Sequence, residues 1–197
     1  MATSGFCPPS VWLSKNAQEG APIELVYAAG FTIGYPMLSI IQGDLRDPRV
    51  VNLVHCHLTR ARAETAPGSA HALDLVGLES PDISFWTVWD DDQLLGIGAL
   101  KQLSIDHCEI KSMYTAQSAR RKGVGRTMLR HIIATARERG VWRLSLETGS
   151  WDYFEPARAL YRSHGFVECP PFADYVPDPN SIFMTLDLRA LQFGDAR

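Results

Sequence analysis

A basic, glycine-containing segment near the middle of the chain has the residue types of an anion-binding loop. Residues 120–126 read Arg-Arg-Lys-Gly-Val-Gly-Arg and lie between a predicted strand and a predicted helix. Glycines at positions 123 and 125 let the backbone approach a ligand closely, and the start of a helix offers unpaired N–H groups at a positive dipole end. Each charge-assisted hydrogen bond to a phosphate contributes roughly 1.5–3 kcal/mol. Several such bonds would anchor a pyrophosphate.

Two familiar phosphate-binding motifs do not account for this loop. A P-loop requires the pattern GxxxxGK[ST], which the chain lacks, and a dinucleotide-binding fingerprint requires a third glycine where the chain has Met128. Residues 116–139 contain seven basic residues and one acid, although the whole chain has a net charge of −3. A basic spot on an acidic chain favours a small anionic ligand, because a polyanion such as DNA requires a broad basic face. We therefore expect no nucleic-acid partner.

The length and composition suit one globular domain. The chain has 197 residues, of which 46% are hydrophobic and 21% are charged, and this excludes disorder throughout. The nearest candidate for a membrane span, residues 23–41, is interrupted by a glutamate, two glycines and a proline, so we expect no membrane segment. The N-terminus lacks the basic start of a signal peptide. The four cysteines lie far apart without CxxC spacing, which predicts reduced thiols in a cytoplasmic protein and no metal site.

Hydrophobic periodicity and capping residues predict the elements that position the loop. Asp47 and Pro48 are typical of a helix start, and Gly140 is typical of a helix end. Helices are predicted over residues 48–64, 71–77, 124–139 and 155–164, and strands over residues 37–42, 83–89, 94–103, 108–115, 142–148, 166–169 and 181–188. This order predicts an α+β fold in which helices flank a mixed, mostly antiparallel sheet. Residues 1–36 show no clear period, and we expect them to form a loose extension of a domain that spans residues 37–197.

Two motifs in this frame carry a resemblance to a known family. Arg120, Gly123 and Gly125 form a pattern that resembles the R/Q-x-x-G-x-G/A signature of the GNAT superfamily, the acetyl-CoA-dependent N-acetyltransferases. Residues 157–166 resemble the family's A-x-x-L-Y-x-x-x-G-F segment, and residues 71–188 as a whole look like a bacterial YsnE-like subgroup. The resemblance implies the GNAT fold, acetyl-CoA as donor substrate and no metal.

The resemblance also implies roles for individual residues. Backbone groups of Met113, Tyr114 and Thr115 would run alongside the pantetheine arm and hold the thioester carbonyl. Tyr161 would be the general acid beside the CoA sulfur, although its helical spacing from Ala157 also suits a core residue. The pyrophosphate would be cradled by the backbone N–H groups of Arg120, Arg121, Lys122, Gly123, Val124, Gly125 and Arg126. Many family members have Asn where this chain has Phe154, and this departure puts a side-chain contact to the pantetheine in question.

Carboxylates are the candidates for a general base. An alkylammonium acceptor has a pKa near 10.4, so freeing its lone pair at pH 7 costs roughly 4.6 kcal/mol, and a base is useful. Glu109 is the first candidate, with a solvated carboxylate at the end of a strand as the alternative interpretation. Glu147 lies in an otherwise apolar strand and is either buried and paired or faces the reaction cleft. His55 and His57 would point apart on a helix, which argues against a metal site there.

The predicted function is direct transfer of an acetyl group from acetyl-CoA to an amine. A small-molecule acceptor is expected first, and a protein N-terminus or a lysine second. The alternative is an acyl-CoA-binding regulatory module that has lost catalysis, which Phe154 keeps open. The resemblance makes a homodimer reasonable.

Overall fold

One seven-stranded sheet organises the part of the chain that the computed structural model describes, residues 38–69 and 71–189. Its strands are β1 (Ser39–Gln42), β2 (Ile83–Asp90), β3 (Gln93–Gln102), β4 (His107–Thr115), β5 (Arg143–Gly149), β6 (Val167–Glu168) and β7 (Ser181–Asp187). The helices are α1 (Pro48–Ala63), α2 (Leu75–Leu78), α3 (Val124–Glu138) and α4 (Glu155–Arg162), with short 3-10 turns η1 (Gln117–Ala119) and η2 (Asp152–Phe154). The element order confirms the predicted α+β fold with a mixed, mostly antiparallel sheet.

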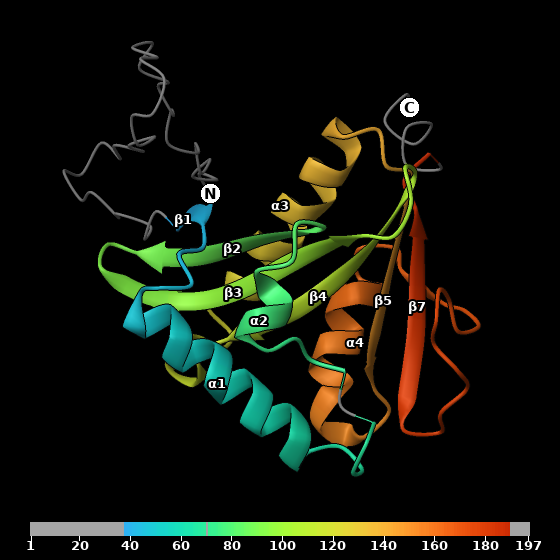
Figure 1. The fold of residues 1–197 in the computed structure, drawn as a ribbon, viewed down its shortest axis with the longest axis horizontal. Coiled ribbons are helices and arrows are strands. Elements are labelled where there is room, and N and C mark those ends of the chain that lie inside the picture. The colour runs from blue at the N-terminus through green and yellow to red at the C-terminus, as the bar shows by residue number, and fades with distance from the viewer. Residues whose placement is uncertain (1–37, 70, 190–197) are drawn as a thin grey trace, which may run out of the picture. The chain divides into compact units, whose positions relative to one another are not determined.

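Different helices cover the two faces of the sheet (Figure 1). The apolar stripe of α3, which includes Met128 and Ile132, packs with Tyr161 of α4 into one core. Val54 and Leu58 of α1 belong to a second core on the other face. Apolar residues at helical spacing therefore form the buried sides of α1 and α3, as the sequence predicted.

The helix starts follow from local side chains. At α1, Asp47 accepts a hydrogen bond of 2.8 Å from the backbone N–H of Arg49, and Pro48 occupies the first turn. The prediction of a helix over residues 71–77 is wrong in its bounds, because α2 begins only at Leu75. Asp74 caps it by accepting a hydrogen bond of 2.8 Å from the N–H of Gly77.

The sheet divides into two parts between its central strands. All neighbouring strands are antiparallel except β4 and β5, whose parallel pairing ends at Ile110 and Leu146. Beyond this point β4 continues along β3 to Thr115, and β5 continues along β7 to Gly149. Figure 1 shows the two strands diverging. We call this divergence the fork.

The predicted extension, residues 1–36, and the predicted domain start at residue 37 lie outside the described residues. Within residues 38–69 and 71–189, no helix is both long enough and apolar enough to cross a membrane.

Candidate active site

The predicted anion loop connects the fork to α3. Gly123 has a φ of 84°, a left-handed conformation that favours glycine, and it directly precedes the helix. The N–H of Thr127 bonds to the carbonyl of Gly123 at 2.9 Å, so the N–H groups of residues 124–126 precede the regular helical bonds. These groups are at the positive end of α3 and are suited to bind an anion. The N–H groups of Arg120 and Lys122, which the prediction also included, instead donate to the carbonyls of Gln117 and Ala119 at 3.4 Å.

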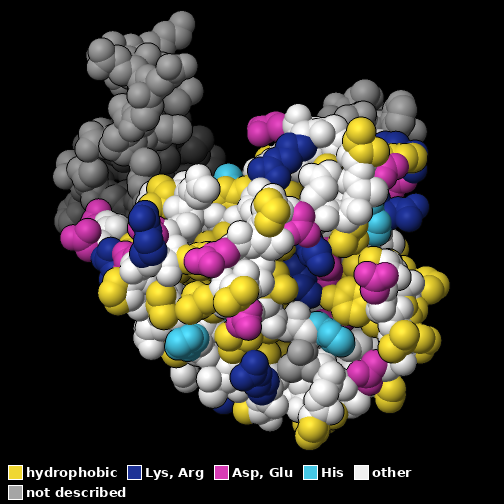
Figure 2. All heavy atoms as spheres, in the orientation of Figure 1, with side chains coloured by type: hydrophobic (Ala, Val, Ile, Leu, Met, Phe, Trp, Pro, Cys, Tyr) yellow, Lys and Arg dark blue, Asp and Glu magenta, His cyan; other side chains and the backbone are white. Residues whose placement is uncertain are grey.

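The basic side chains of the loop are solvent-exposed at Arg120, Arg121, Lys122 and Arg126. Arg120 also donates a hydrogen bond of 3.1 Å to the hydroxyl of Tyr153, which places η2 beside the loop. On the face shown in Figure 2, lysines and arginines are interspersed with aspartates and glutamates.

The edge of β4 inside the fork contains the predicted pantetheine residues. Met113, Tyr114 and Thr115 follow Ile110, so β3 pairs with this part of β4 on one side only. The other edge has no strand partner among the described residues. Unpaired strand edges present backbone donors and acceptors to an extended ligand. The edge leads through η1 directly into the anion loop.

Tyr161 is buried in the core beneath the sheet, where only 6% of its surface is exposed. Its ring contacts Phe166 edge-on, with 5.7 Å between centroids. Burial raises the pKa of the Tyr161 phenol above its ordinary value, and the negative charge of Glu147 raises it further. The phenol therefore stays protonated at neutral pH, and it can donate a proton to a stronger base such as a newly formed thiolate.

Arg158 fixes α4 against the end of β5, a role that sequence analysis missed. Its guanidinium is buried and donates hydrogen bonds to the carbonyls of Gly149 (2.6 Å) and Trp151 (3.0 Å). It also pairs with Glu155 at 2.7 Å. At the same place the Phe154 ring packs against Gly149 so closely that a Cβ at position 149 would overlap it. The sequence carries no signal for this role, because the burial of Arg158 depends on the contact of α4 with the end of β5.

Glu109 lies in a buried triangle of polar groups. Its carboxylate accepts hydrogen bonds from the ammonium of Lys111 (3.1 Å) and the hydroxyl of Tyr175 (2.6 Å). Lys111 also donates to Tyr175 at 2.7 Å. Because Glu109 is only 3% exposed, the alternative interpretation of a solvated carboxylate is wrong. Its predicted role as a base stays a prediction.

Glu147 lies one residue beyond the last β4–β5 pair, whereas Glu109 lies one residue before it. The Glu147 carboxylate accepts a hydrogen bond of 2.7 Å from the hydroxyl of Ser181. Burial raises the pKa of Glu147 above its ordinary value, and the Ser181 hydrogen bond opposes this rise. A carboxylate with a raised pKa is a better proton acceptor than a fully solvated one. Among the two candidates, Glu147 is the one inside the fork.

The two histidines of α1 lie in different surroundings. His55 is exposed, whereas His57 packs against Tyr114 with 5.2 Å between ring centroids. Burial lowers the pKa of His57 to about 4, and the charge of Lys111 contributes. Among residues 38–69 and 71–189, no group of three or more histidines, cysteines, aspartates or glutamates has the geometry to hold a metal ion.

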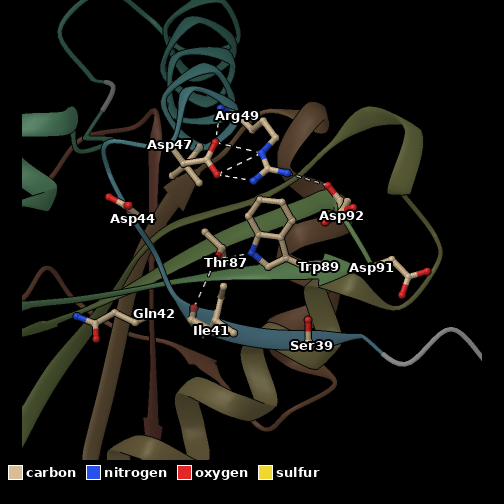
Figure 3. Close-up of a pocket in the computed structure, with 11 residues that line it drawn as sticks. Ser39, Ile41, Gln42, Asp44, Asp47, Arg49, Thr87, Trp89, Asp91 and Asp92 are labelled. Carbon is tan, nitrogen blue, oxygen red and sulfur yellow. Dashed lines mark hydrogen bonds and ion pairs between the residues drawn. The ribbon is translucent and has the colours of Figure 1, made fainter.

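A separate hollow lies at the β1 edge of the sheet, between β1, the start of α1 and the β2–β3 turn (Figure 3). Its walls include four aspartates, but the Arg49 guanidinium binds Asp47 at 2.6 Å and the carbonyl of Asp92 at 3.1 Å. The same guanidinium stacks over Trp89 at 4.5 Å. Arg49 thus covers the ring face of Trp89 in this hollow. The hollow is not part of the fork.

Comparisons with known proteins identify the family. Residues 52–166 match the model of the Acetyltransferase (GNAT) family. An uncharacterized N-acetyltransferase of Bacillus subtilis, YsnE, is 54% identical over 145 residues, which are 74% of this chain and 96% of the relative. These two findings confirm the predicted YsnE-like resemblance and show that the chain is an acyltransferase.

Solved structures agree with the fold. An acyl-CoA N-acyltransferase of Klebsiella pneumoniae superposes with a TM-score of 0.63 at 27% identity and covers 78% of this chain and 99% of that one. A GNAT acetyltransferase of Elizabethkingia anophelis, solved with acetyl-CoA bound, has a TM-score of 0.57 at 16% identity and covers 76% and 97%. From the family match, the close relative and the shared fold, we conclude that the chain belongs to the GNAT family of acetyltransferases.

Proposed function

We propose that this enzyme transfers the acetyl group of acetyl-CoA directly to the amine of a small-molecule acceptor. The observation that carries the proposal is the continuity of the β4 edge inside the fork with the anion loop at the start of α3. A long ligand with an amide-containing arm followed by a pyrophosphate matches this order, with the arm along the β4 edge and the pyrophosphate at the anion loop. The acetyl-CoA in the related fold from Elizabethkingia anophelis supports the same ligand.

The donor is held by backbone groups in this proposal. The N–H groups within residues 120–126 bind the pyrophosphate, except those of Arg120 and Lys122, which donate to the carbonyls of Gln117 and Ala119. Gly123 provides the turn. Backbone groups of Met113, Tyr114 and Thr115 bind the pantetheine arm along the open edge of β4. The thioester then lies at the fork. Glu109 and Glu147 are on one face of the sheet there, and Tyr161 is on the other.

Glu147 is the proposed base, and Glu109 is the second candidate. Glu147 accepts a proton from the acceptor ammonium, and the freed amine attacks the thioester carbonyl carbon. The carbon–sulfur bond of the resulting tetrahedral intermediate breaks, and Tyr161 gives its proton to the departing thiolate. The second proton that the nitrogen loses as the amide forms restores the Tyr161 phenol, and the proton on Glu147 passes to solvent. Glu147 is favoured because it lies inside the fork and accepts a hydrogen bond from one group, the Ser181 hydroxyl. Glu109 already accepts hydrogen bonds from both Lys111 and Tyr175.

A small acceptor is favoured because two loops enclose this face of the sheet. Tyr175, in the segment between β6 and β7, is held to β4 through Glu109. His71, from the segment before α2, contacts the Tyr175 ring edge-on at 5.1 Å. Two segments that meet over β4 leave less room for a folded protein substrate than for a small amine.

Release of CoA from acetyl-CoA tests the proposal. The protein is incubated with acetyl-CoA and pooled small amines, and free CoA is measured by chromatography against a control without amines. Wild type should release CoA with one of the pools. Tyr161→Phe should lose at least tenfold in turnover while its affinity for CoA stays within twofold. Failure of wild type to bind CoA, or full activity of Tyr161→Phe, would contradict the proposal.

A further inference from the structure

Ser112 has an unusual backbone conformation in the centre of the sheet. Its φ is 51°, a left-handed value that is uncommon for a residue with a side chain. It lies in a β-bulge: Tyr114 pairs with Ile97 and Lys111 pairs with Ala99, so three steps on β4 face two steps on β3. Strained conformations of this kind occur often at functional sites.

The hydroxyl of Ser112 is a second, independent anomaly. The residue is only 7% exposed, and its Oγ has no hydrogen-bond partner among the described residues. Most buried polar atoms in folded proteins have a partner, because leaving one unpaired costs free energy. The strained backbone and the unpaired hydroxyl occur at the same residue. Together they indicate that the Ser112 hydroxyl forms its hydrogen bond with a bound ligand.

The location of Ser112 indicates which part of a ligand it meets. It follows Ile110, the last β4 residue paired with β5, by two positions, and it directly precedes Met113 of the open β4 edge. Ser112 is therefore at the point where the strands diverge. In the proposed function this is where the thioester lies, beyond the inner end of the pantetheine arm.

We propose that the Ser112 hydroxyl donates a hydrogen bond to the carbonyl oxygen of the acetyl thioester. This inference rests on the proposed function. The bond orients the carbonyl for attack, and it strengthens as the oxygen gains negative charge in the tetrahedral intermediate. No covalent bond to Ser112 forms: no base among the described residues is hydrogen-bonded to its Oγ, as an activated nucleophile requires. Ser112 is thus a residue that positions the acetyl group.

Paired ligands distinguish this role from a purely structural one. Affinities for acetyl-CoA and for S-ethyl-CoA, which has the same two carbons without the carbonyl oxygen, are measured by calorimetry on wild type and Ser112→Ala. We expect Ser112→Ala to bind acetyl-CoA about fivefold more weakly, the effect of losing one hydrogen bond. Its affinity for S-ethyl-CoA should stay within twofold. Ser118→Ala, which changes an exposed serine of η1, is the matched control and should alter neither affinity.

Stability and a second variant complete the test. Without ligand, Ser112→Ala should melt at the same temperature as wild type or up to about 4 °C higher, because it removes a buried unpaired hydroxyl. Ser112→Gly also removes the hydroxyl but relaxes the backbone, and it should show the same selective loss for acetyl-CoA.

Three results would overturn the inference. In the first, Ser112→Ala binds acetyl-CoA as tightly as wild type does. In the second, it loses affinity for acetyl-CoA and S-ethyl-CoA equally. In the third, Ser112→Ala loses the preference for acetyl-CoA but Ser112→Gly retains that preference. If wild type binds neither ligand, the proposed function fails together with the inference. If wild type binds both ligands and only the variant result is negative, the inference alone fails.

Discussion

Arg158 donates a hydrogen bond of 2.6 Å to the backbone carbonyl of Gly149, and this bond ties α4 to the end of β5. The strand and the helix contribute different candidate groups to the reaction, Glu147 and Tyr161. The distance between Glu147 and Tyr161 therefore depends on the buried Arg158 guanidinium, which donates hydrogen bonds to backbone carbonyls and to Glu155.

The first prediction concerns this tie. Arg158→Ala should lower the free energy of unfolding by about 2–4 kcal/mol, because it leaves the buried carbonyl of Gly149 and the partly buried carbonyl of Trp151 without their donor. Urea denaturation measures the change. Arg162→Ala is the control: Arg162 also pairs with Glu155, at 2.8 Å, but it is exposed and should cost less than about 1 kcal/mol. Equal losses for both variants would contradict the role of Arg158.

The second prediction concerns the contact between Phe154 and Gly149. Gly149→Ala should destabilise the protein by about 1–3 kcal/mol, because the added methyl group overlaps the Phe154 ring. Phe154→Leu in the same chain should recover part of that loss, since it removes the overlapping ring atoms. Thermal unfolding of the two single variants and the double variant gives the coupling energy. Additive losses would show that the two positions do not interact.

The third prediction concerns His57 and pH. Burial lowers its pKa from 6.5 to about 4, so the unfolded chain binds this proton more readily than the folded chain does. The stability from this group is present above pH 6.5 and is lost as pH falls toward 4, by up to about 3 kcal/mol. Wild type should therefore lose more stability than His57→Gln across this interval in urea denaturation. His55→Gln, at an exposed position, should follow the wild-type profile; an unchanged profile for His57→Gln would exclude the effect.

The fourth prediction separates the two carboxylates. Glu147→Gln should lower kcat by about 10²–10⁴-fold, with CoA affinity within twofold of wild type, because only deprotonation of the amine is affected. Its residual activity should rise with pH as more acceptor becomes a free amine. Steady-state kinetics between pH 6 and 10 check this, once an acceptor is identified.

Two further variants accompany this measurement. Glu168→Gln changes an exposed carboxylate of β6 and should leave kcat unchanged. Glu109→Gln weakens the partner of buried Lys111, so it should lower the free energy of unfolding as well as activity. A kcat loss confined to Glu109→Gln, without a loss of stability, would assign the base to Glu109 instead.

The sequence by itself determined the order of the elements, most of their bounds and the glycine turn before α3. These features depend on neighbours in the chain: Asp47 caps the helix that begins at the next residue, and Gly123 turns the backbone directly before α3. The YsnE-like motifs are also contiguous in the chain, which is why their residues alone are enough to recognise the family.

Only the tertiary structure decided where the candidate groups lie relative to one another. Glu109 and Tyr175 are 66 residues apart and meet through a hydrogen bond of 2.6 Å, and the fork arises because β4 and β5 each follow a different neighbouring strand. The bulge at Ser112 appears only in the register between β3 and β4. Local periodicity indicates which side of an element is buried, but the residues of a distant segment that it meets depend on strand pairing and register, which form only in the tertiary structure.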